Sequence, residues 1–270
     1  MRGYLAIWAV VAACGNGGGS GVDATGDPLA DGIGLSILDA YGKAWGEGDA
    51  AARKRLLEYS AVDTLTVYEP TRTLASRDAV DAAIVEFLAG TPGGSVVLVG
   101  NIREAHERVW LRWDTRNGSG TSIAAGVDLM KRGPDQRLER VHSFFGSLPT
   151  TVGTHTPVQQ ALIDAWNQPN GSMRNALLAT AVTDDVVFAI ESESVIISGR
   201  ATLSAIIGTK LSAEPGRVLS VTSGYLDLPK AFHVAWKVDG TTGPPSGVMM
   251  GLLADDGRIA EAVYFDGAEP

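Results

Sequence analysis

Cysteine is almost absent from this 270-residue chain, since Cys14 is the only one, so no disulfide can form within it. Histidine is also scarce: the four histidines include no pair at metal-ligand spacing, and we expect no metal site. Basic residues are outnumbered 22 to 31, and the formal net charge of −9 leaves no electrostatic footprint for nucleic acid. Because no glycine-rich loop precedes a helix in a phosphate-binding pattern, we expect no cofactor.

The N-terminal segment has little positive charge and only a short apolar run. Arg2 is followed by apolar residues from Leu5 to Ala13, and the small pair Ala12-Ala13 directly precedes Cys14. About nine apolar residues are too few for a membrane-spanning helix, which needs roughly 20, but they suit a signal peptide. The segment resembles a bacterial lipoprotein signal. The alternative is a short soluble N-terminus with a buried cysteine.

The lipoprotein resemblance implies where the protein would reside. Residues 1–13 would be removed, and Cys14 would be lipidated and hold the protein on a lipid bilayer. Residues 14–33 are rich in glycine and read as a flexible linker. We therefore expect a lipid-anchored protein of the cell envelope, on its periplasmic or outer-membrane side.

Two long segments of the chain follow one pattern. The first contains Ala44-Trp45, Gly126-Val127-Asp128-Leu129 and Phe144-Phe145-Gly146. The second segment contains the matching motifs 121 residues later: Ala165-Trp166, Gly247-Val248-Met249-Met250 and Phe265-Asp266-Gly267. Trp113 is matched by Trp236 at a spacing of 123. A period this long describes a whole domain, not a solenoid unit, so we expect domains at 34–148 and 157–268 with a linker at 149–156.

Hydrophobic periodicity predicts the same order of elements in both segments. Helices come first, at 35–45, 50–57 and 78–88, with a short strand at 64–68, and then strands at 96–102, 105–113, 122–130 and 138–145. The second segment predicts helices at 158–166, 173–181 and 200–208, a strand at 186–190, and strands at 218–225, 231–238, 246–253 and 259–265. Helices followed by an antiparallel meander indicate an α+β fold.

Several motifs in the second segment carry a family resemblance. They are Ser198-Gly199-Arg200-Ala201, Asp256-Gly257-Arg258-Ile259 and Tyr264-Phe265-Asp266. The chain resembles the SnoaL-like branch of the nuclear transport factor 2-like superfamily. This implies two tandem cone-shaped domains, each with three N-terminal helices packed on a curved antiparallel β-sheet around one pocket. Such domains include isomerases, hydrolases and cyclases as well as non-enzymatic binding and assembly modules.

Asp128 and His142 are the candidate catalytic residues of the first domain. They lie on neighbouring predicted strands, and a buried His–Asp pair could act as base and orienting group. We place Leu138, Arg140 and Phe144 on the same face as His142. The alternative is that His142 covers the sheet surface and Asp128 faces solvent. The second domain has Val263 and Met249 at these positions, so no acid–base set is shared by both.

Aromatic residues in register between the domains are the candidate ligand-binding residues, together with the closing motif: Trp45, Trp113, Trp166, Trp236, Tyr264 and Asp266. Each tryptophan could equally be ordinary core. Three functions stay open: a lipid-anchored module that binds a small apolar ligand, an enzyme with one active pocket using Asp128 and His142, and an assembly module whose two domains form an internal pseudo-dimer.

Overall fold

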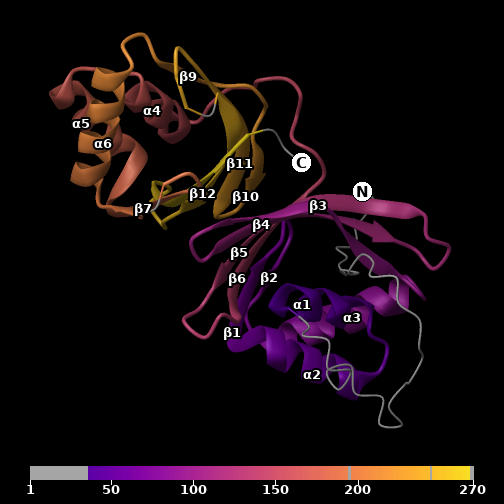
Figure 1. Cartoon of the computed structure of the whole chain (residues 1–270). Coiled ribbons are helices and arrows are strands. Elements are labelled where there is room, and N and C mark those ends of the chain that lie inside the picture. The colour runs from indigo at the N-terminus through magenta and orange to yellow at the C-terminus, as the bar shows by residue number, and fades with distance from the viewer. Residues whose placement is uncertain (1–35, 194–195, 244, 268–270) are drawn as a thin grey trace. The chain divides into compact units, whose positions relative to one another are not determined.

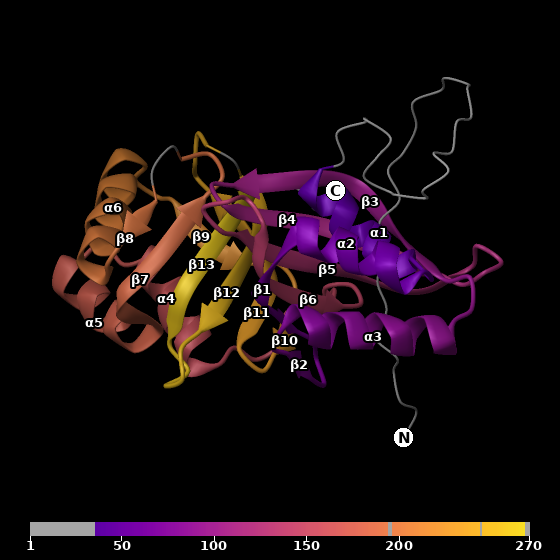
Figure 2. The ribbon, with the colours of Figure 1, turned by 90° about the horizontal axis from the view of Figure 1, so that it is seen from below.

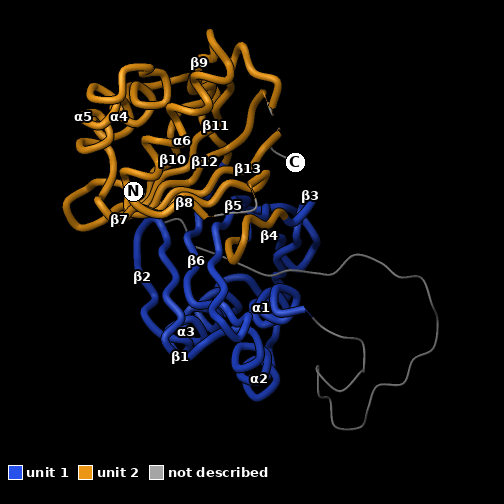
Figure 3. Tube along the Cα trace, turned by 60° about the vertical axis from the view of Figure 1, so that its left-hand side comes forward, with its two compact units in different colours: residues 1–102, 109–146 blue, residues 103–108, 147–270 orange. Residues whose placement is uncertain are grey.

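The computed structural model describes residues 36–193, 196–243 and 245–267 (Figure 1). The expected signal peptide, Cys14 and the linker at 14–33 lie outside the described residues. The chain divides into two compact units (Figure 3). Unit 1 takes in Met1–Ile102 and Val109–Gly146, and unit 2 takes in Arg103–Arg108 and Ser147–Pro270.

The helices of unit 1 begin at side chains that accept backbone hydrogen bonds. Ser36 accepts the N–H of Asp39, and Asp49 accepts the N–H of Ala52, which satisfies donors left free at a helix start. The helices are α1 (Ile37–Gly46), α2 (Ala50–Ser60) and α3 (Arg77–Gly90). They lie on one side of the sheet, and their apolar faces supply much of the core (Figure 1).

The sheet of unit 1 has the order β2-β1-β6-β5-β4-β3 (Figure 2). Its strands are β1 (Ala61–Tyr68), β2 (Thr73–Leu74), β3 (Ser95–Ala105), β4 (Arg108–Arg116), β5 (Ser122–Arg132) and β6 (Leu138–Phe145). The expectation of a purely antiparallel sheet is wrong, because β1 pairs parallel with β6. β1 follows the first two helices in the chain and lies beside β6, the last strand of the unit, running in the same direction.

Unit 2 has the same succession of elements. Its helices are α4 (Pro157–Trp166), α5 (Gly171–Ala181) and α6 (Arg200–Ala213). Its strands are β7 (Val182–Ile190), β8 (Ile197–Ser198), β9 (Val218–Val221), β10 (Leu226–Leu228), β11 (Ala231–Asp239), β12 (Ser246–Leu253) and β13 (Ile259–Asp266). The sheet order is β10-β11-β12-β13-β7-β8, with β9 on β11, and β13 pairs parallel with β7.

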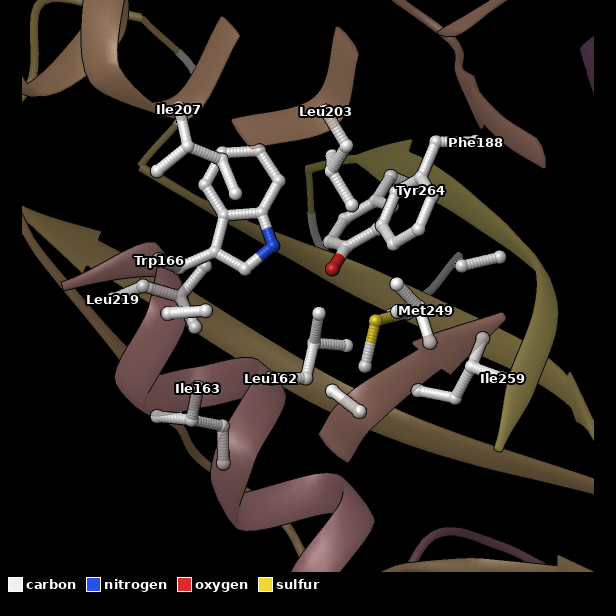
Figure 4. Packing of buried hydrophobic residues seen from close by; sticks show 14 of the residues in the cluster. Leu162, Ile163, Trp166, Phe188, Leu203, Ile207, Leu219, Met249, Ile259 and Tyr264 are labelled. Carbon is white, nitrogen blue, oxygen red and sulfur yellow. The ribbon is translucent and has the colours of Figure 1, made fainter. Parts of the chain in front are cut away.

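Each unit has a hydrophobic core of its own between helices and sheet. In unit 2, helix residues such as Leu162, Leu203 and Ile207 pack toward Phe188 and Tyr264 on the strands (Figure 4). Within the described ranges, no helix is both long and apolar enough to cross a membrane.

Candidate functional site

A cavity of about 290 Å³ lies in unit 2, close to the lower end of the roughly 300–1,000 Å³ typical of small-molecule pockets. Its apolar walls come from the helices and the sheet: Trp166, Ile190, Leu219, Trp236 and Tyr264. Its polar wall is formed by Lys210, Glu214, Arg217, Thr241, Thr242 and Asp266. An aromatic interior with polar groups on one side suits a small organic molecule that is mostly apolar.

Tyr264 is the centre of the aromatic wall. Its ring centroid lies 5.9 Å from that of Trp166 and 6.1 Å from that of Trp236, and it stacks on Phe188 at 5.7 Å. The indole nitrogen of Trp166 and the hydroxyl of Tyr264 turn toward one another (Figure 4). Burial raises the pKa of the Tyr264 hydroxyl, and the neighbouring Trp166 indole offsets this only in part. Tyr264 therefore presents a neutral hydroxyl.

Glycine at position 247 makes room for the Trp236 ring. Trp236 on β11 pairs with Gly247 on β12. A Cβ on Gly247 would meet the indole at 2.6 Å from Cζ2 and 2.8 Å from Cε2, and it would collide with the carbonyl oxygen of Phe265. Unit 1 repeats the arrangement, because a Cβ on Gly126 would collide with the ring of Trp113. The glycine that both copies have at this position is thus explained by an indole lying on the strand backbone.

Glu214 ties the loop after β11 to the end of α6. Its carboxylate accepts hydrogen bonds from the Thr242 backbone N–H (2.9 Å), the Thr241 hydroxyl (3.0 Å) and Arg217 Nη1 (2.7 Å). These donors, led by the Thr242 amide, lower the pKa of Glu214 to about 2. The carboxylate is therefore ionised at neutral pH and holds the Thr241–Thr242 segment at the polar wall of the cavity.

The structure brings together four of the six expected ligand-binding residues. Trp166, Trp236, Tyr264 and Asp266 all line the cavity of unit 2. Trp45 and Trp113 instead lie in the core cluster of unit 1, exposed by no more than 1%. Sequence reasoning missed Glu214 and Arg217, although their i, i+3 spacing beyond the expected third helix was a visible signal for a paired end of that helix.

Asp128 lies inside unit 1 and is completely buried. Trp113 Nε1 donates to its Oδ1 at 3.0 Å. Burial raises the pKa of Asp128 well above its ordinary value, while the Trp113 indole and the Ser143 hydroxyl oppose that shift. The alternative of an Asp128 facing solvent is wrong. The same carboxyl also contributes to the raised pKa of the buried Tyr41.

His142 lies on the other face of the sheet, so the expected pair with Asp128 does not form. Asp128 on β5 pairs with Ser143, whereas His142 pairs with Leu129, and neighbouring side chains of a strand point to opposite faces. His142 instead stacks on Tyr68, with ring centroids 4.6 Å apart. It is only 3% exposed, and burial, with the charge of Arg140, lowers its pKa to about 3.

No cluster of three or more His, Cys, Asp or Glu side chains that could hold a metal ion occurs among the described residues. The remaining histidines are not gathered at the cavity. His233 lies on the face of β11 opposite Phe232, Val234 and Trp236, and it is buried. His106 occupies the turn between β3 and β4 with a positive φ of 58°.

Comparisons with known proteins give structural neighbours only. No family model and no curated protein matches the chain. It is similar to a SnoaL-like family protein from Agrobacterium tumefaciens (22% identity, TM-score 0.39), covering 41% of this chain and 95% of that one. An NTF2-like protein of unknown function from Exiguobacterium is similar at 15% identity and TM-score 0.36, with 42% and 99% covered. A SnoaL-like protein from Jannaschia is similar at 15% identity and TM-score 0.33, with 42% and 90% covered.

Proposed function

We propose that unit 2 binds a small, largely apolar molecule in the cavity lined by Trp166, Trp236 and Tyr264. The observation that carries this proposal is the cavity itself, about 290 Å³ with aromatic walls and a charged edge. Apolar side chains in a closed core normally fill the available space. A hollow with this lining stabilises a guest through apolar burial, at about 25 cal/mol per Å² removed from water.

The test is binding of a small aromatic probe, 2-ethylnaphthalene, to the full chain by equilibrium dialysis. Ala213 lines the cavity from the exposed end of α6, so Ala213→Trp should fill the cavity without touching the core. Ala205→Trp on the solvent side of the same helix is the matched control. We expect saturable binding that Ala213→Trp abolishes and Ala205→Trp leaves intact. Equal binding to all three proteins would contradict the proposal. If the expected binding is found, mass spectrometry of natively purified protein would identify a co-purifying ligand.

We further propose that the chain is a tandem pair of SnoaL-like domains of the nuclear transport factor 2-like superfamily. Support comes from the 121-residue repeat and from two sheets with matching strand order, each of which contains one parallel pair between its first long strand and its last strand. The Trp-on-Gly packing found in both units adds a detail that unrelated domains have no reason to share. Separate expression of residues 34–148 and 157–268 tests this organisation, since each half should fold cooperatively.

The cell-envelope anchor through Cys14 is also a proposal, supported by the apolar run at 5–13 and the small residues before the cysteine. We expect the full chain, expressed in a bacterium that processes lipoproteins, to sediment with membranes and to carry diacylglycerol on Cys14. The Cys14→Ser variant should not carry it. Recovery of the wild-type chain unprocessed in the soluble fraction would contradict the anchor.

Catalysis of hydrolase, isomerase or cyclase type in unit 1 is the second candidate. The observation that favours it is the buried carboxyl of Asp128, whose raised pKa is of the kind found in proton-transfer sites. His142 takes no part in this version, because it lies on the other face of the sheet. Turnover that Asp128→Asn abolishes and His142→Phe retains would support it, and turnover unaffected by Asp128→Asn would contradict it.

A further inference from the structure

Arg53 in unit 1 and Arg174 in unit 2 occupy equivalent positions, because each is the fourth residue of an 11-residue helix, α2 and α5 respectively. Both residues are buried, with exposed fractions of 4% and 7%. Arg53 has a carboxylate partner, since its Nε donates to Oδ1 of Asp81 on α3 at 2.6 Å. The residue of α6 equivalent to Asp81 is Ser204. Arg174 therefore has a hydroxyl where Arg53 has an opposite charge.

The hydrogen bonds of Arg174 all go to uncharged groups. Its Nε donates to the carbonyl oxygen of Ser204 at 3.0 Å and to the Ser204 hydroxyl at 3.2 Å. Its Nη1 donates to the carbonyl oxygens of Gln168 at 2.8 Å and Pro169 at 3.2 Å. A buried cation without an opposite charge is unfavourable, because uncharged acceptors replace only part of the hydration that it loses. An anion beside Arg174 would therefore be favourable.

Nη2 is the atom of Arg174 that is available to an anion. It donates to no group among the residues that the structure describes, and it is not one of the fully buried atoms without a partner, so it keeps accessible surface. Glycines lie on either side of it, because a Cβ on Gly171 would lie 3.6 Å from Nη2 and a Cβ on Gly208 would lie 2.6 Å from it. Unit 1 has Ala50 and Val85 at the equivalent positions. Unit 2 thus has both an unused N–H donor and small residues beside it.

The start of α5 supplies two further donors. Asn170 accepts the N–H of Met173 with its side chain and the N–H of Arg174 with its carbonyl oxygen. The N–H groups of Gly171 and Ser172 have no acceptor within the described part of the chain. Unpaired N–H groups and the helix dipole make the start of a helix favourable for an anion. The buried guanidinium and the helix start therefore favour the same kind of ligand.

The charges of α5 and α6 also favour an anion. The two helices lie side by side (Figures 1 and 2). Together they carry three cations, Arg174, Arg200 and Lys210, and no aspartate or glutamate. Arg200 pairs with Asp184 and Lys210 with Glu193. Within the described ranges, Arg174 is the cation of these helices that has no carboxylate partner.

We propose that unit 2 binds a phosphate group at this site, held by Arg174 Nη2 and by the backbone N–H groups of Gly171 and Ser172. A tetrahedral oxyanion suits the site, because its several oxygens can accept from the guanidinium and from the helix start together. None of these residues lines the cavity, so the phosphate site does not depend on the ligand proposed for that cavity. Unit 1 lacks an equivalent site, because Asp81 already pairs with Arg53.

The test is a titration of the full chain with inorganic phosphate at constant ionic strength, followed by broadening of the ³¹P resonance. Ser204→Asp gives α6 the carboxylate that α3 has at Asp81. We expect saturable binding by the wild type, and binding weakened about tenfold or more in Ser204→Asp, because the guanidinium is then neutralised. Ser212→Asp adds the same charge at an exposed position of α6 and should bind phosphate as the wild type does.

A second pair of variants tests the start of α5. Gly171→Pro removes one N–H donor at the first helical position, where proline is well tolerated. Gly171→Ala keeps that donor and is the matched control. Gly171→Pro should weaken phosphate binding more than Gly171→Ala does, and this comparison keeps the inference testable if Ser204→Asp does not fold.

Four results would overturn the inference. The first is a wild type that shows no saturable phosphate binding. The second is an equal affinity in Ser204→Asp and Ser212→Asp, which would show that phosphate responds at most to net charge. The third is equal binding by Gly171→Pro and Gly171→Ala, and the fourth is tighter binding of acetate than of phosphate. sn-Glycerol 3-phosphate identifies the source of the phosphate group. If it competes with inorganic phosphate, the site accepts a phosphate ester, and if it does not, the ligand is the free ion.

Discussion

Trp113 Nε1 donates a 3.0 Å hydrogen bond to Asp128 in the interior of unit 1, and the acceptor is a carboxyl with no exposed surface. Because burial raises the pKa of Asp128 in the folded chain, the unfolded chain ionises first as the pH rises above the ordinary value of 3.8. The folded state therefore loses stability from about pH 4 upward until the raised folded pKa is passed.

Replacing the carboxyl by an amide removes this pH dependence. The Asp128→Asn variant keeps an acceptor oxygen for Trp113 but cannot ionise. We expect the free energy of unfolding of Asp128→Asn, relative to wild type, to increase between pH 4.5 and pH 7.5, as measured by urea titration. A relative stability that is the same at both pH values would show that Asp128 is not protonated preferentially in the folded state.

His142 has the opposite pH response. The pKa of His142 in the folded chain is lowered from 6.5 to about 3. Between these two pH values the imidazole is protonated in the unfolded chain and neutral in the folded chain. Stability from this group is complete above pH 6.5 and falls with decreasing pH, by about 2 kcal/mol at pH 5. The His142→Phe variant can keep the stack on Tyr68 and should lack this loss. Parallel urea titrations at pH 7.5 and 5.0 measure it, and an equal loss in both proteins would contradict the assignment.

Gly247 has no room for a side chain, because a Cβ would meet the Trp236 indole and the backbone of Phe265. We expect Gly247→Ala to lower the free energy of unfolding by about 1–3 kcal/mol, the usual effect of overpacking, and to weaken probe binding by shifting the indole. Gly153→Ala is the matched control, since nothing lies within 4 Å of a Cβ there. Similar urea midpoints for the two variants would refute the packing role of Gly247.

Glu214 holds the Thr241–Thr242 segment through its carboxylate. The Glu214→Gln substitution removes the charge and weakens these hydrogen bonds, so the Thr242 amide should exchange with deuterium faster at pH 7. Because the pKa of Glu214 is lowered to about 2, its contribution is present above its ordinary value of 4.5 and is lost as the pH falls through 2. Asp255→Asn, which removes an exposed partner of Lys230, should leave that amide unchanged. An unaltered exchange rate of the Thr242 amide in Glu214→Gln would show that the Glu214 carboxylate does not hold the Thr241–Thr242 segment.

Much of the local structure was predictable because it depends on neighbours along the chain. The second helix begins at Ala50 as expected, with Asp49 as its cap, and β6 and β12 have the expected bounds. The expected strand at 218–225 instead ends at Val221, and β10 follows it after a break. The short strands β2 and β8 were missed, since two residues show no periodicity.

The face on which His142 lies depended on one irregularity that the sequence pattern does not show. We expected Leu138 to share a face with Arg140, but the register shifts between the Lys131 and Arg132 pairings, and Leu138 packs in the core with Val141. After this shift in register the side chains alternate strictly. Ser143 therefore lies beside Asp128, and His142 lies on the opposite face of the sheet. The internal pseudo-dimer stays a prediction.

The sequence by itself determined the repeat, the α+β class and the set of aromatic residues from which the cavity is built, because periodicity and spacing reflect local backbone geometry and burial. Only the tertiary structure decided that β1 and β7 pair parallel to the final strands, and that Asp128 faces Trp113 instead of His142. It also decided that the described cavity lies in unit 2. These outcomes depend on register and packing between residues far apart in the chain, where a change of one position moves a side chain to the opposite face.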